Sequence, residues 1–163
     1  MSQLMGAALV FEGGETSPAA VERAFAPWLN GVVRSADGAW DPRGLSDARM
    51  TFSAHDTGYD VLVLRFSSNA MARDPARTLA KIDHWLVLGA QHGAQLGYLT
   101  RYSDFVDDPL LRDEVLVPLL AQWWERIAGA PYTRILWGRE RPEQPGGVVV
   151  ARGDWGVLVD AGR

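Results

Sequence analysis

The 163-residue chain contains no cysteine, and Lys81 is its single lysine. The absence of cysteine excludes a disulfide framework, a thiolate metal site and a cysteine nucleophile. No apolar run approaches the roughly 18 residues that a membrane span requires. The first residues also lack the basic segment and apolar run of a secretory signal. We therefore expect a cytoplasmic protein of bacterial type that does not enter membranes.

Positive charge is scarcer than negative charge, because 16 Lys and Arg stand against 20 Asp and Glu, for a formal net charge of −4. Proteins that bind nucleic acid usually carry a basic surface, so this balance argues against a nucleic-acid partner. A mildly acidic protein is better suited to a basic protein surface. Hydrophobic residues make up 47% of the chain, which is untypical of disorder. We predict one folded domain over residues 1–163.

Hydrophobic periodicity divides the chain into strands and helices. Short apolar or alternating runs predict strands at residues 5–12, 50–55, 59–67, 95–102, 133–137, 148–151 and 156–159. Helices are expected where a capping residue precedes proline, at Ser17–Pro18, Asp74–Pro75 and Asp108–Pro109. Pro27 should kink or shorten the first helix.

The first six elements follow the β-α-β-β-α-β order of ferredoxin-like folds, a resemblance of topology without a family motif. We therefore predict an α+β protein with a ferredoxin-like core, an added C-terminal helix and short antiparallel strands. Strand 5–12 should be central, with strand 59–67 beside it and strand 50–55 outside that pair. In such a fold one sheet face is open, and a second subunit, a ligand or the C-terminal segment must cover it.

Two patterns that resemble chemical motifs are better explained by structure. Gly13 and Gly14 lie between a predicted strand and a predicted helix, where glycines can cradle phosphate. The carboxylates of Glu12 and Glu15 would repel phosphate, so a plain turn is expected. The histidines, His55, His84 and His92, lack the spacing of metal ligands. We predict neither a metal nor another cofactor.

The densest acidic cluster is formed by Asp104, Asp107 and Asp108. These carboxylates can cap the third predicted helix, contact a protein partner or hold a hard cation. The spacing lacks the central glycine and distal glutamate of an EF-hand. Capping and protein contact are therefore favoured over a metal.

Aromatic residues provide further candidate binding positions. Tyr98 and Tyr102 fall on one face of their strand, where they line a binding surface if that face is open, or are buried if the terminal segment covers it. Gly97, on the other face, leaves room for a helix to approach. Trp40 and Trp155 lie in or beside turns, where a large apolar side chain is harder to bury, so they are candidate contact anchors.

These observations favour a non-catalytic protein-binding domain, such as a bacterial regulator or an immunity-type protein that neutralises a toxin. Its expected binding residues are Tyr98, Tyr102, Asp104, Asp107 and Trp40. The alternative is a small-molecule enzyme or ligand-binding protein that uses the open face of a ferredoxin-like sheet, alone or as a homodimer. Basic residues or a His–carboxylate pair converging on a deep pocket would favour that alternative.

Overall fold

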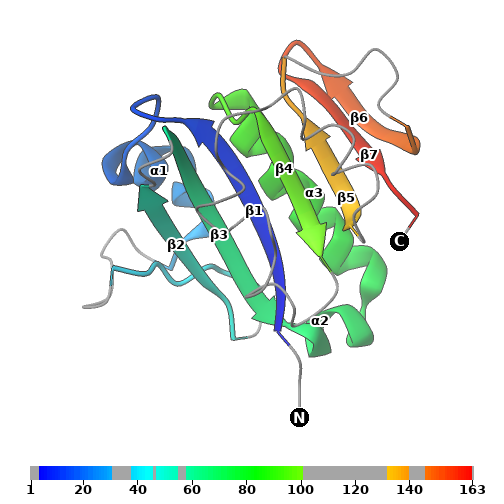
Figure 1. Ribbon diagram of the computed structural model, residues 1–163. Coiled ribbons are helices and arrows are strands. Elements are labelled where there is room, and N and C mark those ends of the chain that lie inside the picture. Colours follow the sequence, from blue (N-terminus) through cyan, green and yellow to red (C-terminus); the bar gives the residue numbers. More distant parts are fainter. Residues whose placement is uncertain are drawn as a thin grey trace.

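The computed structural model describes residues 4–30, 38–45, 47–54, 58–100, 132–139 and 146–162. The predicted α+β class is confirmed, because seven antiparallel strands form one open sheet, with helices packed behind it (Figure 1). The strands are β1 (Leu4–Glu12), β2 (Arg49–Ala54), β3 (Tyr59–Ser67), β4 (Leu96–Thr100), β5 (Tyr132–Trp137), β6 (Val148–Gly153) and β7 (Gly156–Asp160). The helices are α1 (Pro18–Ala24), the 3-10 turn η1 (Ala26–Trp28), α2 (Ser68–Arg73) and α3 (Pro75–Gln91).

The strand order is β2-β3-β1-β4-β5-β7-β6. The predicted positions of the first strands are confirmed, since β1 lies between β3 and β4 and β2 lies outside β3. As a whole, however, this order differs from that of a four-stranded ferredoxin-like sheet, because β5, β7 and β6 continue the sheet beyond β4. Strand β5 pairs with the outer backbone groups of β4, which would otherwise form an exposed edge.

The helix starts lie where capping chemistry predicts them. The Ser17 Oγ accepts a hydrogen bond from the Ala20 N–H at 3.2 Å, and Asp74 Oδ1 accepts one from Arg77 N–H at 3.1 Å. Proline is the first residue of both α1 and α3. The predicted effect of Pro27 is also confirmed, because α1 ends at Ala24 and the chain continues as η1.

Helix α2 was not expected from the sequence. It spans six residues, contains no buried side chain and ends immediately before the Asp74 cap of α3, so it lacks the apolar stripe that would predict it. The third predicted helix, at residues 108–129, lies outside the described residues. In the part of the chain that is described, no helix is both long and apolar enough to cross a membrane.

Each face of the sheet carries a buried core. On the face covered by α1 and α3, the core includes the side chains of Leu9, Phe11, Phe25, Trp85 and Leu86. The close approach expected over Gly97 is confirmed, because a Cβ there would lie 3.0 Å from Leu86 Cδ2 of α3. The other face forms a second cluster around Val10, Val63, Tyr98, Ile135 and Trp137.

A partly buried cluster of charges connects α3 to the added strands. Arg134 on β5 is 8% exposed and donates from Nε to Asp83 Oδ1 of α3 at 2.9 Å. Its Nη1 lies 3.1 Å from Asp160 Oδ2 at the end of β7. The two ion pairs therefore link α3, β5 and β7 at one point.

Candidate functional site

The predicted site residues that the structure describes lie inside the protein. Tyr98 is fully buried, and its ring stacks on Tyr132 with centroids 4.3 Å apart. Of the two alternatives for the tyrosine face, burial therefore holds for Tyr98. Tyr102, Asp104 and Asp107 lie outside the described residues.

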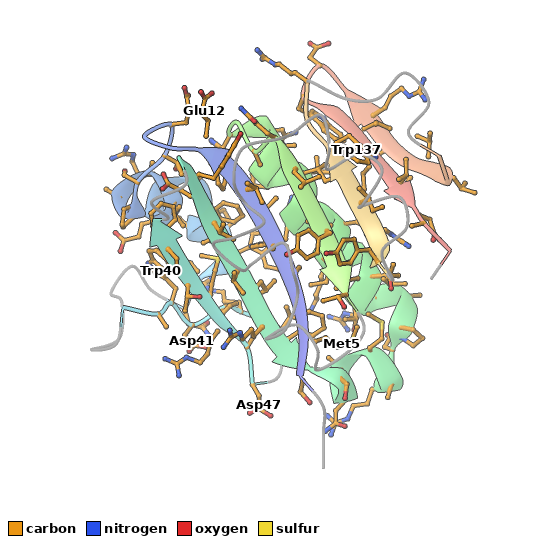
Figure 2. All side chains as sticks on the ribbon, in the orientation of Figure 1. Met5, Glu12, Trp40, Asp41, Asp47 and Trp137 are labelled. Carbon is orange, nitrogen blue, oxygen red and sulfur yellow. The ribbon has the colours of Figure 1, made fainter. Side chains whose placement is uncertain are left out.

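The expectation that Trp40 is exposed was wrong, since only 1% of it is accessible. Its backbone forms a bridge with Met50 of β2, and its indole Nε1 donates to Glu22 Oε1 of α1 at 3.1 Å. Figure 2 shows Trp40 beside β2. This backbone bridge to β2 places Trp40 where the sheet and α1 bury its large side chain.

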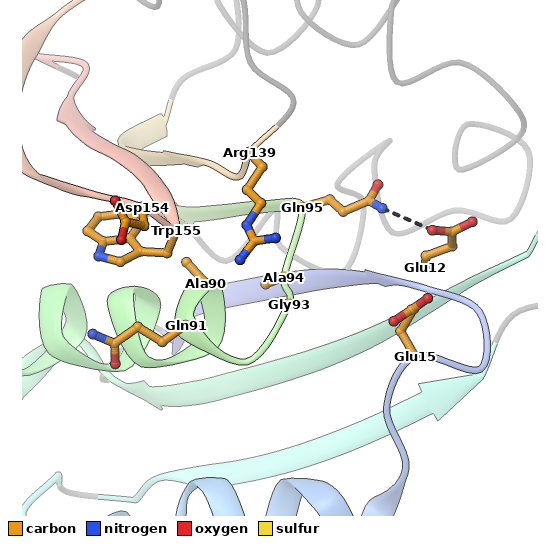
Figure 3. A pocket seen from close by; sticks show the side chains of 10 residues that line it. All are labelled: Glu12, Glu15, Ala90, Gln91, Gly93, Ala94, Gln95, Arg139, Asp154 and Trp155. Carbon is orange, nitrogen blue, oxygen red and sulfur yellow. Dashed lines mark hydrogen bonds between the residues drawn. The ribbon is translucent and has the colours of Figure 1, made fainter.

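A cleft of about 530 Å³ lies at the end of the sheet where β1 ends and β4 begins (Figure 3). It is the candidate functional site. The side chains that give it chemical character are Glu12, Glu15, Gln95, Arg139, Asp154 and Trp155.

The first wall is the turn between β1 and α1. The Glu15 N–H donates to the Glu12 carbonyl at 3.0 Å, and the Gly14 N–H donates to Asp60 Oδ2 at 3.3 Å. This geometry confirms the plain turn expected at the two glycines, with the backbone N–H of Gly14 already bonded to a carboxylate. The turn holds the exposed carboxylates of Glu12 and Glu15 at the rim of the cleft.

The opposite wall is the turn of the β6–β7 hairpin, which consists of Asp154 and Trp155. Trp155 is half-buried and packs against the core on the α3 side of the sheet. Its indole lies over Gly153, where an added Cβ would come 2.5 Å from Nε1. The ring is thus held in place, while part of its surface remains accessible to a ligand.

The floor of the cleft is the turn between α3 and β4. The Gln95 Nε2 donates to Glu12 Oε2 at 3.3 Å, which fixes the amide orientation and leaves Oε1 as an acceptor. That Oε1 is buried and has no hydrogen-bond partner within the described residues. The C-terminal end of α3 also lies here, and its carbonyl groups carry partial negative charge.

Arg139 follows β5 and points into the cleft between the two walls (Figure 3). The described part of the lining also contains the carboxylates of Glu12, Glu15 and Asp154, so its charged side chains carry an excess of negative charge. Among the residues that the structure describes, no group of three His, Cys, Asp or Glu side chains is arranged to hold a metal ion.

No family model, curated protein or solved structure matches this chain.

Sequence reasoning singled out only one residue of this cleft as a candidate anchor, Trp155, because an aromatic residue beside a turn is hard to bury. Glu12 and Glu15 were considered only as the flanks of a glycine turn. Arg139 lies in a polar segment without periodicity, and nothing local distinguishes it from other exposed arginines. These residues come together only because β1 and β5 end, β4 begins and the β6–β7 hairpin turns at the same side of the sheet.

Proposed function

We propose that this protein is a non-catalytic protein-binding domain of the cytoplasm, of the kind found in bacterial regulators and immunity-type proteins, and that the cleft contacts its partner. The observation that carries the proposal is a firmly seated, partly accessible tryptophan within an acidic cleft. Aromatic residues with a rim of charged side chains commonly provide most of the binding energy at protein interfaces.

The charge of the cleft favours a basic partner. Among the described residues of the lining, three carboxylates stand against one guanidinium, and the chain as a whole carries a net charge of −4. Complementary charge accelerates encounter and selects among partners, and its effect decreases with added salt.

The proposal extends to the fold. The order β2-β3-β1-β4, with α1 and α3 behind the sheet, supports a ferredoxin-like unit in the first part of the chain. Strands β5, β7 and β6 are then an extension of that unit. Arg139 follows β5, and Trp155 lies in the turn that connects β6 to β7. The extension therefore supplies one side of the cleft.

The test is capture of a partner by the wild-type protein and by two matched variants. Glu15→Gln removes one exposed carboxylate at the cleft, and Asp47→Asn removes one far from it, at the opposite end of the sheet from Glu12 (Figure 2). Asn tolerates the left-handed backbone of Asp47, whose φ is 53°. Glu15→Gln should weaken partner binding and reduce its salt dependence, whereas Asp47→Asn should bind as wild type. Equal affinity of all three proteins would exclude the cleft as the contact site.

A second candidate is a small-molecule binding protein. The cleft volume of about 530 Å³ falls within the range of roughly 300–1,000 Å³ of ligand pockets, and Arg139 together with the carboxylates offers both charges to a zwitterion. Such a ligand would bind in the cleft and not on the sheet face expected from the sequence, since Tyr98 on that face is buried. A metabolite that raises the Tm saturably, and fails to do so with Arg139→Gln, would favour this candidate.

A further inference from the structure

We infer that the partner presents an arginine side chain to the cleft and that this side chain displaces Arg139. The inference rests on the proposed protein-binding function and adds the chemical identity of the contact. It also gives Arg139 a role, as an intramolecular competitor that occupies the site when no partner is bound.

The lining of the cleft selects for a cation. Glu12 and Glu15 lie on one wall and Asp154 on the other, so a cation between the walls is attracted from both sides. The C-terminal end of α3 at the floor adds partial negative charge of the same sign. Against these stands Arg139, whose guanidinium already points into this space. The chain's own guanidinium thus shows which chemical group the space accommodates.

Two features favour arginine over lysine. A planar guanidinium stacks on an aromatic face and is more weakly hydrated than an ammonium, and the Trp155 indole is held in the wall of the cleft by its packing over Gly153. A guanidinium also has five N–H donors in a fixed fork. Such a group can bond carboxylates on both walls of the cleft together, whereas an ammonium concentrates its donors at one point.

Arg139 must then oppose the ligand. It carries the same charge and lies in the same space, so a bound arginine either displaces it or is repelled by it. Removal of this side chain should strengthen binding of a cation and weaken binding of an anion or a zwitterion. The sign of the effect therefore separates this inference from the small-molecule candidate.

The experiment is an NMR titration that follows the indole N–H signal of Trp155, identified by its loss in Trp155→Phe. The probe is N-acetyl-arginine methylamide, whose only charge is its guanidinium, compared with N-acetyl-lysine methylamide. The arginine compound should shift the signal saturably with Kd of about 1 mM, as expected for a single contact. The Kd of the lysine compound should be at least about threefold higher, which is the factor expected from stacking of the guanidinium on an exposed ring.

The variants test the assignment further. Glu15→Gln should weaken binding of the arginine compound about threefold, Arg139→Gln should strengthen it by a similar factor, and Asp47→Asn should leave it unchanged. Absence of a saturable shift in both the wild type and Arg139→Gln would overturn the inference, as would equal binding of the lysine compound. Weaker binding in Arg139→Gln would show that Arg139 holds the ligand and does not compete with it.

Failure of the inference is distinguishable from failure of the proposed function. If Glu15→Gln weakens partner capture while the arginine compound does not bind, the cleft contacts a protein by other chemistry, and the arginine inference is wrong. If the arginine compound binds while partner capture is unaffected by Glu15→Gln, the cation site stands, but the partner binds elsewhere, so the proposed contact through the cleft is wrong.

Discussion

The hairpin turn that carries Asp154 and Trp155 depends on one residue, Gly156. Its φ of 137° is strained for other residue types, and an added Cβ would overlap the carbonyl oxygen of Trp137. Gly156 opens β7, which pairs with β5, so the absence of a side chain lets the two strands meet closely below the turn. One glycine therefore determines where the second wall of the cleft lies.

Gly156→Ala should be much more destabilising than Gly14→Ala, although both glycines have positive φ. Gly14 has open space around it, so alanine there should cost only the strain of the left-handed conformation, about 1–2 kcal/mol. At Gly156 the clash with Trp137 is added to strain. Urea titration gives the free energy of unfolding of each variant. Similar losses in the two variants would contradict the close approach of β7 to β5.

A second residue-scale prediction concerns Asp83. Burial raises the pKa of this carboxyl above its ordinary value of 3.8, although the charge and hydrogen bond of Arg134 lower it; Asp160 adds a further rise. Because the folded pKa lies above the unfolded one, the folded protein binds the proton more tightly. The contribution of Asp83 to stability is therefore fully present below pH 3.8 and is lost as the pH rises through the folded pKa.

Comparison of the wild type with Asp83→Asn tests that sign. The asparagine variant lacks this titration, so the unfolding free energy of the wild type minus that of the variant should fall as pH rises from about 3 to 6. Chemical denaturation at several pH values gives this difference. A difference that rises with pH would mean that attraction to Arg134 outweighs burial.

At the scale of elements, α3 connects the core to the cleft. It buries Ile82, Trp85 and Leu86 against the sheet, and the ring of Trp85 lies 5.9 Å from that of Phe25. Its N-terminus is fixed by the Asp74 cap, while its C-terminal end forms part of the cleft floor. The helix ends at Gln91, and the left-handed Gly93, with φ of 99°, then turns the chain toward β4.

Asp74→Ala should lower the free energy of unfolding by about 1 kcal/mol, because it removes the acceptor for the Arg77 N–H at the start of α3. Asp74→Asn keeps an acceptor of similar geometry and should lose only a fraction of that amount. Urea titration of both variants makes the comparison. If asparagine and alanine are equally destabilising, the charge of Asp74 matters and its capping bond does not.

At the scale of the whole molecule, the sheet has two unequal edges. The β2 edge is partly closed by the backbone bridge between Trp40 and Met50. The β6 edge carries exposed valines, with Val148 71% accessible, and a register shift between Val149 and Ala151. Bulges of this kind twist an edge strand and hinder its pairing with another chain.

Val148→Lys should change the free energy of unfolding by less than about 0.5 kcal/mol, since the side chain is exposed. Its partner across the ladder is Asp160, whose charge is opposite to that of lysine. Val159→Lys, on the neighbouring strand, should prevent stable folding, because Val159 is buried. Thermal denaturation compares the two. A large loss in Val148→Lys would mean that the β6 edge is covered in solution.

Local features of this chain were predictable because the interactions behind them span only a few residues. Serine or aspartate before proline marked the starts of α1 and α3, and Pro27 marked the end of α1. Apolar periodicity also identified the first strands of the sheet. Helix α2 could not be predicted from hydrophobic periodicity, because a short exposed helix has no apolar stripe.

The α+β class, the early strand placements and the plain glycine turn follow from the sequence alone, because capping, periodicity and steric limits act over short separations. Three features follow only from tertiary contacts: β5, β7 and β6 extend the sheet beyond β4, Trp40 is buried, and Arg139 and Trp155 face Glu12 across a cleft. These outcomes depend on which distant backbone edges pair and which surfaces they bring together. Strands pair through backbone groups, which every residue type carries, so the side chains of a single sequence do not reveal which strands pair.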